Sequence, residues 1–159
     1  MYIRAMTEEI IIRRGIATDV PAALELVKEL AVFENAPDAV KVTPEEMTKA
    51  GFGRDKIFEF FVAEYAGVVV GLALYYYKYS TWKGRCLYLD DLIVTSTYRR
   101  RGIGKQLIEA VLKTGREQGV RRAEWQVLDW NKEAIDFYRS FGVVLDEEWI
   151  NCHYYFSNE

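Results

Sequence analysis

Cysteine and histidine are scarce in this sequence of 159 residues, which contains only two cysteines and one histidine. Cys86 and Cys152 stand far apart, without the neighbouring partners that a zinc or redox motif needs. We therefore expect no disulfide framework and no bound metal, and we expect both thiols to be reduced and packed. The single histidine, His153, lies in an aromatic segment where a packed strand residue is a better interpretation than a catalytic one.

Long apolar runs and an excess of positive charge are also missing. No stretch approaches the roughly 18 uninterrupted apolar residues of a membrane-spanning helix, and residues 1–9 lack the apolar core of a signal peptide. The formal net charge is −3, with acidic and basic residues mixed along the chain, unlike the basic surface of a nucleic-acid binder. We expect a soluble, cytoplasmic protein that binds neither nucleic acid nor membrane.

Half of the residues are hydrophobic, which at this length suits one domain around one core. The first part of the chain predicts a strand over residues 10–14, then an amphipathic helix over residues 20–31. A capping box at Thr43–Glu46 starts a second helix that ends near Gly51 or Gly53. Three strands of an antiparallel meander then follow over these ranges: 58–65, 68–79 and 85–94, the first two joined by a turn at residues 66–67.

The second part of the chain begins with a glycine-bearing loop over residues 99–104. The loop leads into a helix whose apolar side chains share one face: Leu107, Ile108, Val111 and Leu112. A strand over residues 123–128, a helix capped by Asn131 and final strands within residues 143–156 complete the order βααβββαβαββ. We expect one α/β domain over residues 1–159 with a mixed sheet, residues 1–9 forming a loose tail.

The loop between the predicted strand and helix has the features of an anion site. Its sequence runs Tyr98-Arg99-Arg100-Arg101-Gly102-Ile103-Gly104-Lys105. Glycines let the backbone approach an anion, and the free N–H groups at the start of a helix carry positive potential. The loop lacks the Gly-Lys-Ser/Thr of a P-loop and the third glycine of a dinucleotide fingerprint. A pyrophosphate in another kind of ligand fits, and a plain exposed turn is the alternative.

At this loop the sequence resembles a known family. Arg99-x-x-Gly102-x-Gly104 is similar to the Q/R-x-x-G-x-G/A signature of the GNAT acetyltransferases. Residues 88–94, Tyr-Leu-Asp-Asp-Leu-Ile-Val, resemble that family's central strand, and residues 131–142 resemble its late helix. Three further segments resemble the diamine (spermidine/spermine) and thialysine acetyltransferases: residues 28–34, 71–94 and 129–133. The similarity extends from Ile10 to Trp149.

The resemblance implies the GNAT fold, with a mostly antiparallel sheet whose central strands splay to admit acetyl-CoA, and no metal. It implies that backbone groups of Ile93 and Val94 bond the pantetheine, and that the amides of the loop hold the pyrophosphate, those of Arg99, Arg100, Arg101, Gly102, Ile103, Gly104 and Lys105. A backbone N–H of Leu92 or Val94 would meet the oxygen that becomes negative. Family members are commonly homodimers, and residues 154–156 suit either an interface strand or the domain core.

An alkyl ammonium has a reference pKa near 10.4, so only about one molecule in 2000 is a free amine at neutral pH. The resemblance places Asp90 where the attacking nitrogen arrives, as a base acting directly or through water; an ordinary strand-end carboxylate is the alternative. The diamine acetyltransferases usually carry Glu-Asp where this chain has Asp90-Asp91. Strand alternation puts Asp91 on the opposite face, so we interpret Asp91 as structural.

Tyr138 matches the family position of an acid that protonates the departing CoA sulfur, although its spacing also fits a core aromatic. Asn131 suits a CoA contact, a helix cap or both. Substrate selection is expected from acids that attract a cation and aromatics that hold its methylenes. Candidates are Glu34, Trp82 and either Glu147 or Glu148, with Asp90; surface acids on a solvated face are the alternative.

Together these patterns predict an acetyl-CoA-dependent N-acetyltransferase that acts on the primary amine of a small cationic substrate by direct attack in a ternary complex. The substrate would be a polyamine, a diamine or a thialysine-like compound. One alternative is acetylation of peptide α-amines or lysine side chains, which needs an open groove rather than an acidic pocket. The other is a non-catalytic module that senses acetyl-CoA; the tyrosine at 138 and the carboxylate at 90 weigh against it.

Overall fold

A computed structural model of the chain describes residues 9–156. The chain forms two compact units, Met1–Trp125 and Gln126–Glu159. The tail predicted over residues 1–9 lies outside the described residues except for Glu9.

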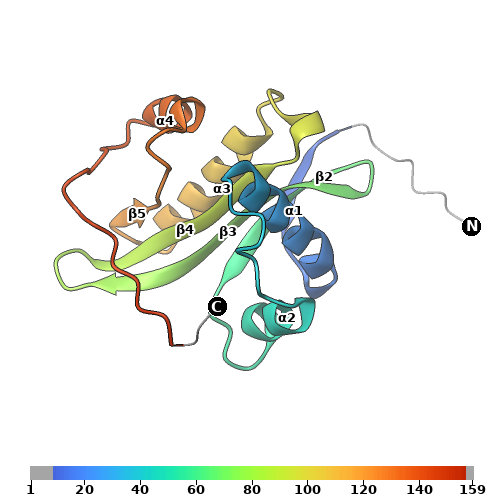
Figure 1. The fold of residues 1–159 in the computed structure, drawn as a ribbon, viewed down its shortest axis with the longest axis horizontal. Helices are drawn as coiled ribbons and strands as arrows, with labels where there is room; N and C mark the ends of the chain where they lie inside the picture. The colour runs from blue at the N-terminus through green and yellow to red at the C-terminus, as the bar shows by residue number, and fades with distance from the viewer. Residues whose placement is uncertain (1–8, 157–159) are drawn as a thin grey trace, which may run out of the picture. The chain divides into compact units, whose positions relative to one another are not determined.

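The first unit is a five-stranded sheet with helices on its faces (Figure 1). The strands follow one another in sheet order; they are β1 (Ile11–Arg14), β2 (Glu59–Tyr65), β3 (Val68–Ser80), β4 (Gly84–Val94) and β5 (Arg122–Glu124). The helices are α1 (Val20–Phe33), α2 (Pro44–Phe52) and α3 (Ile103–Glu117), with short 3-10 turns η1 (Ala17–Asp19) and η2 (Ser96–Tyr98). Neighbouring strands are antiparallel except β4 and β5, which are parallel. The predicted mixed α/β sheet is confirmed.

Local sequence explains where several of these elements begin and turn. Thr43 accepts a hydrogen bond from the Glu46 N–H at 3.2 Å, and the Glu46 carboxylate accepts one from the Thr43 N–H at 2.8 Å. This capping box starts α2 where the sequence predicts it. Ala66 and Gly67 have φ angles of 48° and 81°, so both residues of the β2–β3 turn are left-handed. Such a two-residue turn matches the twist of a hairpin and fixes its register.

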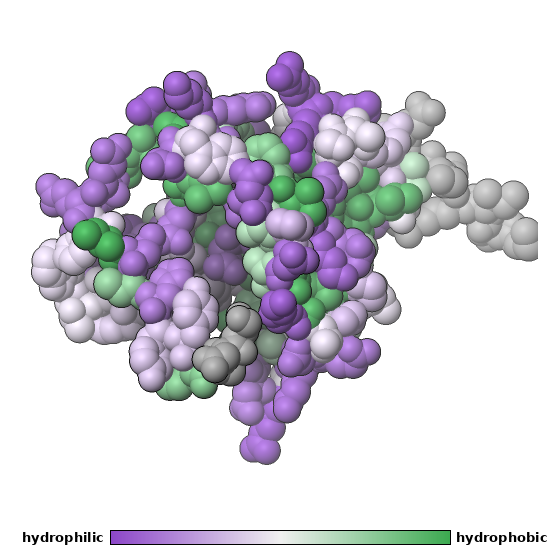
Figure 2. Space-filling view, in the orientation of Figure 1, coloured by the Kyte–Doolittle hydropathy of each residue, from purple (hydrophilic) through white to green (hydrophobic). Residues whose placement is uncertain are grey.

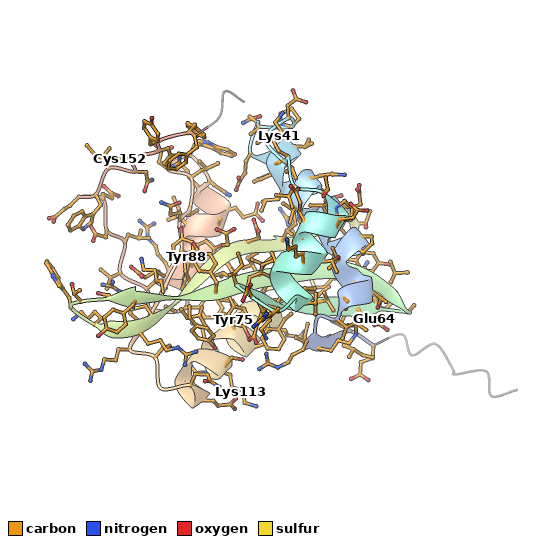
Figure 3. The ribbon with its side chains drawn as sticks, turned by 90° about the horizontal axis from the view of Figure 1, so that it is seen from below. Lys41, Glu64, Tyr75, Tyr88, Lys113 and Cys152 are labelled. Carbon is orange, nitrogen blue, oxygen red and sulfur yellow. The ribbon has the colours of Figure 1, made fainter. Side chains whose placement is uncertain are left out.

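Apolar side chains lie on both faces of the sheet. Helices α1 and α2 cover one face, where residues such as Val20, Leu24 and Met47 pack against Leu72, Leu74 and Ile93 in a buried cluster. Helix α3 covers the other face with Ile103, Leu107, Ile108 and Val111, all buried. Figure 3 shows Lys41, just before α2, and Lys113 of α3 on opposite sides of the sheet. In Figure 2, hydrophilic side chains cover much of the outer surface of α1 and α2.

The second unit contains one helix, α4 (Lys132–Arg139), and an irregular segment after it within the described residues. The final strands predicted within residues 143–156 are not formed, so that prediction is wrong. A strand needs a ladder partner for its N–H and C=O groups, and the described residues of this unit offer none. Cys152 and His153 are exposed here rather than packed, whereas Cys86 in β4 is fully buried as expected.

Candidate active site

Strand β4 is interrupted by a β-bulge at the two adjacent aspartates. In the β3–β4 ladder, Leu74 pairs with Asp91 and Tyr75 pairs with Leu89, so Asp90 is an extra residue without a partner. A bulge locally breaks the alternation of side chains between the two faces of a sheet. The expectation that Asp90 and Asp91 point to opposite faces is therefore wrong at this position.

Both aspartates belong to the sheet face that carries α1 and α2. Asp91 pairs with Leu74, whose side chain lies in the buried cluster of that face, and directly paired residues share a face. Asp90 lines a pocket with Leu74 and Tyr76. The charge of Asp90 also raises the pKa of Asp91. The interpretation of Asp91 as a purely structural residue thus loses its geometric basis.

Glu34, Asp90 and Asp91 form a group of three carboxylates, here named the acidic cluster. Desolvation, together with the charges of Asp90 and Glu34, raises the pKa of Asp91 to about 7. Partial desolvation also raises the pKa of Asp90 and of Glu34. Glu34 follows the last residue of α1, Phe33, so the end of this helix brings the third acid. Like charges held in a poorly hydrated place favour binding of a cation.

Two tyrosines extend the acidic cluster along the same face. The rings of Tyr76 and Tyr88 pair across β3 and β4, with centroids 5.2 Å apart. Burial raises the pKa of both hydroxyl groups, and the nearby charge of Asp90 raises it further. Aromatic faces can cover the methylene groups of an amine and attract its charge. Sequence reasoning assigned neither tyrosine a role, although their two-residue spacing from Leu74 and Asp90 could have indicated it.

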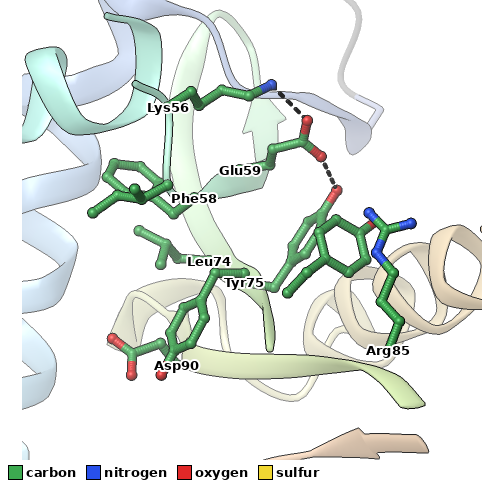
Figure 4. A pocket seen from close by; sticks show the side chains of 10 residues that line it. Lys56, Phe58, Glu59, Leu74, Tyr75, Arg85 and Asp90 are labelled. Carbon is green, nitrogen blue, oxygen red and sulfur yellow. Dashed lines mark hydrogen bonds and ion pairs between the residues drawn. The ribbon is translucent and has the colours of Figure 1, made fainter. Parts of the chain in front are cut away.

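The pocket beside Asp90 has a volume of ≈ 760 Å³. Its other wall is held by a polar chain in which Lys56 contacts Glu59 at 2.7 Å and the Tyr75 hydroxyl donates to Glu59 at 2.9 Å (Figure 4). Arg14 donates to the Tyr75 oxygen at 3.2 Å. Burial and the Glu59 carboxylate raise the pKa of Tyr75 to about 12. Tyr75 is therefore a fixed, neutral donor that holds the start of β2 against β3.

Beyond the bulge, β4 presents a free backbone edge. Only residues 86–88 pair with β5, so within the described first unit the β5 side of residues 89–94 has no strand partner. The Thr95 N–H donates to the Val70 carbonyl at 2.9 Å, which makes Val94 and Gly71 a non-hydrogen-bonded pair whose polar groups point away from each other. The backbones of Val94 and, two residues earlier, Leu92 therefore face the free edge.

The same register corrects one expected cofactor contact. Ile93 pairs with Leu72 between the two positions whose backbones face outwards. Its N–H and C=O therefore bond to β3 rather than to the free edge. Its side chain is buried in the α1 and α2 cluster. A backbone bond from Ile93 to pantetheine is not available in this arrangement, whereas the N–H groups of Val94 and Leu92 face the free edge.

The loop after β4 presents unpaired N–H groups beside positive charge. Gly102 is the N-cap of α3 with φ 73°, and Arg100 has φ 61°. The first backbone bond of the helix runs from the Gln106 N–H to the Gly102 carbonyl, so the amides just before residue 106 point out from the helix start. Arg99, Arg100, Arg101 and Lys105 surround this end with exposed side chains. A diphosphate fits such a donor set.

The carboxylate of Glu29, on α1, holds the first residues of this loop. It accepts hydrogen bonds from the Thr95 hydroxyl at 2.8 Å and from the Ser96 N–H at 2.9 Å. The Arg99 guanidinium lies 3.8 Å from the same carboxylate, and its Nε donates to the Val94 carbonyl at 3.0 Å. Helix α1 thus links the acidic cluster to the loop. Glu29 lies within the Lys-Glu-Leu segment that carries the resemblance, but its sequence alone gives no partner.

Trp82 does not join this site. It lies in the turn between β3 and β4 with 81% of its surface exposed. The six β4 residues 84–89 lie between it and Asp90, which corresponds to about 20 Å along an extended strand. The expected position of Trp82 near the slot is wrong for the described first unit.

The remaining predicted residues lie in the second unit. Asn131 caps α4, and its side-chain oxygen accepts from the Ala134 N–H at 3.2 Å, so the capping interpretation is confirmed. Tyr138 lies on α4 beside Phe137, with ring centroids 5.4 Å apart. Glu148 lies in the irregular segment, and its N–H donates to Asp146 at 3.1 Å. The catalytic role of Tyr138 and the substrate role of Glu148 stay predictions.

Comparison with known proteins identifies the kind of enzyme. The model of the acetyltransferase (GNAT) family matches residues 24–143. Thialysine N-epsilon-acetyltransferase of Bos taurus is 38% identical over 141 residues, which cover 84% of this chain and 83% of that protein. Spermidine/spermine N(1)-acetyltransferase-like protein 1 of Homo sapiens is 34% identical over 140 residues, 84% of this chain and 20% of that protein.

A crystal structure of an aminoglycoside acetyltransferase from an uncultured soil metagenomic sample has a similar fold, with a TM-score of 0.77 and 25% identity over 93% of this chain and 97% of that one. These matches define an acetyl-transferring enzyme. The chain belongs to the GNAT family of acetyltransferases, and this membership implies acetyl-CoA as the co-substrate.

Within residues 9–156, none of the helices combines the length and the apolar character that crossing a membrane requires. In the same residues, no group of three or more His, Cys, Asp or Glu side chains is arranged to hold a metal ion.

Proposed function

We propose that this enzyme acetylates the primary amine of a small cationic substrate, such as a diamine, a polyamine or a thialysine-like amino acid. The observation that carries the proposal is the acidic cluster, which the bulge in β4 and the end of α1 bring together. Three carboxylates with raised pKa values, next to two tyrosine rings, match a primary ammonium on a short methylene chain. The thialysine and spermidine/spermine relatives support the same class of substrate.

The first chemical step is removal of a proton from the bound ammonium. Its reference pKa near 10.4 leaves about one amine in 2000 free at neutral pH, so a nearby acceptor accelerates attack. Asp90 and Asp91 act as a coupled pair, in which Asp91 has a pKa of about 7 and Asp90 is the more exposed. A proton taken from the ammonium, directly or through water, belongs to the pair rather than to one residue.

The chain's other groups orient the acetyl donor and complete the transfer. Bound acetyl-CoA supplies a thioester carbonyl that a free amine can attack. The amides at the start of α3 hold its diphosphate. Of the outward-facing N–H groups of Leu92 and Val94, one bonds its pantetheine and the other donates to the carbonyl oxygen as negative charge develops there. Tyr138 donates a proton to the departing sulfur.

A thiol-release assay with a set of amines tests this proposal. Spermidine, putrescine, thialysine and free lysine are compared with a lysine-containing peptide at saturating acetyl-CoA. We expect CoA release with at least one small cationic amine at a kcat/KM at least tenfold above that of the peptide. A peptide that reacts faster than every small amine would favour a protein acetyltransferase. Tight acetyl-CoA binding without CoA release in the presence of any amine would favour a sensor module.

Homodimer formation by this enzyme stays a prediction.

A further inference from the structure

A group of charged residues lies further along the substrate face, beyond the two tyrosines. Lys78 Nζ lies 2.9 Å from Oε2 of Glu124, and Arg122 contacts Oε1 of the same carboxylate at 3.1 Å. Lys78 Nζ also lies 5.6 Å from the centroid of the Tyr88 ring. These three residues, here named the distal triad, have side chains that solvent reaches partly: 41% of Lys78, 39% of Arg122 and 27% of Glu124 are exposed.

Sheet register places the distal triad on the same face as the acidic cluster. Lys78 lies two residues from Tyr76 and four from Leu74 on β3, and residues at even spacing share a face. Arg122 and Glu124 of β5 pair with Cys86 and Tyr88 of β4. Tyr88 in turn pairs with Tyr76. A continuous surface therefore runs from the carboxylates over the tyrosine rings to the distal triad.

The two ends of this surface carry opposite net charge. The acidic cluster contributes up to three negative charges, while the distal triad contains two cations and one anion and is net positive. Leu74 and Lys78 are four residues apart, which corresponds to about 13 Å along the strand. A side chain of lysine length spans about 6 to 7 Å, and polar contacts of about 3 Å at each end complete that distance.

We infer that the distal triad binds the α-amino acid end of the substrate, with Lys78 contacting the α-carboxylate and Glu124 contacting the α-ammonium. This inference rests on the proposed function, because it needs the side-chain ammonium to sit in the acidic cluster. An amino acid with an amine at the end of its side chain matches the charges at both ends. A diamine or polyamine instead places a second cation beside Lys78, which disfavours it. The distal triad thus selects amino acids over polyamines.

Three compounds separate the roles of the two side chains. They are thialysine, the diamine that remains when its carboxylate is removed, and the acid that remains when its α-amine is removed. We expect Lys78→Met to lower kcat/KM roughly tenfold or more for the two compounds that carry a carboxylate, and to raise kcat/KM for the diamine, whose second ammonium Lys78 repels. We expect Glu124→Gln to lower kcat/KM for thialysine and for the diamine, which both carry a second amine. It should leave kcat/KM unchanged for the analogue that lacks the α-amine.

Matched variants distinguish recognition from folding. Lys78→Arg keeps the charge and should retain the preference for thialysine, whereas Lys83→Met removes an exposed lysine of the β3–β4 turn and should change nothing. Thermal melting checks that each variant folds. A purely structural ion pair would lower kcat/KM equally for the three compounds, and this result would overturn the inference, as would unchanged values for all three.

The wild-type enzyme alone separates the inference from the proposed function. Release of CoA with thialysine and with the diamine at equal kcat/KM would overturn the amino acid subsite and leave the amine acetyltransferase intact. No release with any of the three compounds, in a protein that binds acetyl-CoA, would overturn both.

Discussion

At the scale of single residues, Asp91 shows that the site lowers the stability of the fold. Its pKa is about 7 in the folded chain and near 3.9 in an unfolded one. Between these values the folded state holds a proton that the unfolded state lacks, so the free energy of unfolding falls as pH rises from about 4 to about 7 and is then level. Removing this carboxylate should therefore stabilise the protein above pH 7.

Asp91→Asn is expected to raise the melting temperature by roughly 2 to 6 °C at pH 8 and by less at pH 5. The amide has nearly the same shape and no charge to desolvate. Melting curves at both pH values measure the effect, with Asp55→Asn in the exposed loop before β2 as the control. A variant less stable than wild type at pH 8 would show that Asp91 supports the fold rather than the chemistry.

The second residue-scale prediction concerns Tyr138. Tyr138→Phe keeps the ring and removes only the hydroxyl that we propose as the proton donor to sulfur. Turnover should fall at least about tenfold, with little change in acetyl-CoA affinity. Single-turnover kinetics and calorimetry measure the two quantities, and Tyr79→Phe, at a 77% exposed position of β3, serves as the control. Unchanged turnover would remove Tyr138 from the mechanism.

At the scale of elements, Glu29 couples α1 to the loop that precedes α3. Glu29→Gln keeps the size of the side chain but weakens two hydrogen bonds to the loop and the contact to Arg99. Because the loop amides then lose their fixed orientation, acetyl-CoA affinity should fall roughly fivefold to tenfold. Calorimetry tests this, with Glu25→Gln on the exposed face of the same helix as the control. Equal affinity in both variants would exclude the coupling.

The start of α3 gives a second prediction at this scale. Gly102 has φ 73°, and a Cβ built there meets no atom within 4 Å, so an added side chain has room but a strained backbone. Gly102→Asp adds negative charge beside the diphosphate, whereas Gly102→Ala adds only the strain. Acetyl-CoA affinity should fall at least about tenfold more for the aspartate than for the alanine. Equal affinities for the two variants would place the diphosphate elsewhere.

Element by element, the sequence predicts the meander and the helices well because their signals are local. The capping box at Thr43 and the left-handed turn at Ala66–Gly67 depend only on neighbouring residues. The bulge at Asp90 is different, since it arises from the register of β3 against β4, and no residue type marks it. Strand alternation therefore predicts the wrong face for Asp91, and the resemblance implies the wrong edge for the backbone of Ile93.

At the scale of the whole molecule, apolar periodicity predicts which residues form the core, but it also predicts strands that do not form. Residues 143–156 are rich in aromatic and β-branched side chains, yet they form no strand because pairing depends on a partner that the sequence does not name. The acidic cluster likewise combines residues from α1 and β4 that are more than 50 positions apart. Resemblance suggested Glu34 and Asp90 separately, and the fold supplied Asp91 between them.

The pH dependence of kcat/KM for thialysine tests most directly whether the acidic cluster accepts the proton of the substrate. In the wild-type enzyme, kcat/KM should rise with pH through a pKa near 7, the value of the Asp91 carboxyl, as the cluster becomes deprotonated. Asp91→Asn should remove this rise and lower the plateau at least about tenfold. Identical profiles for the two enzymes would contradict the account.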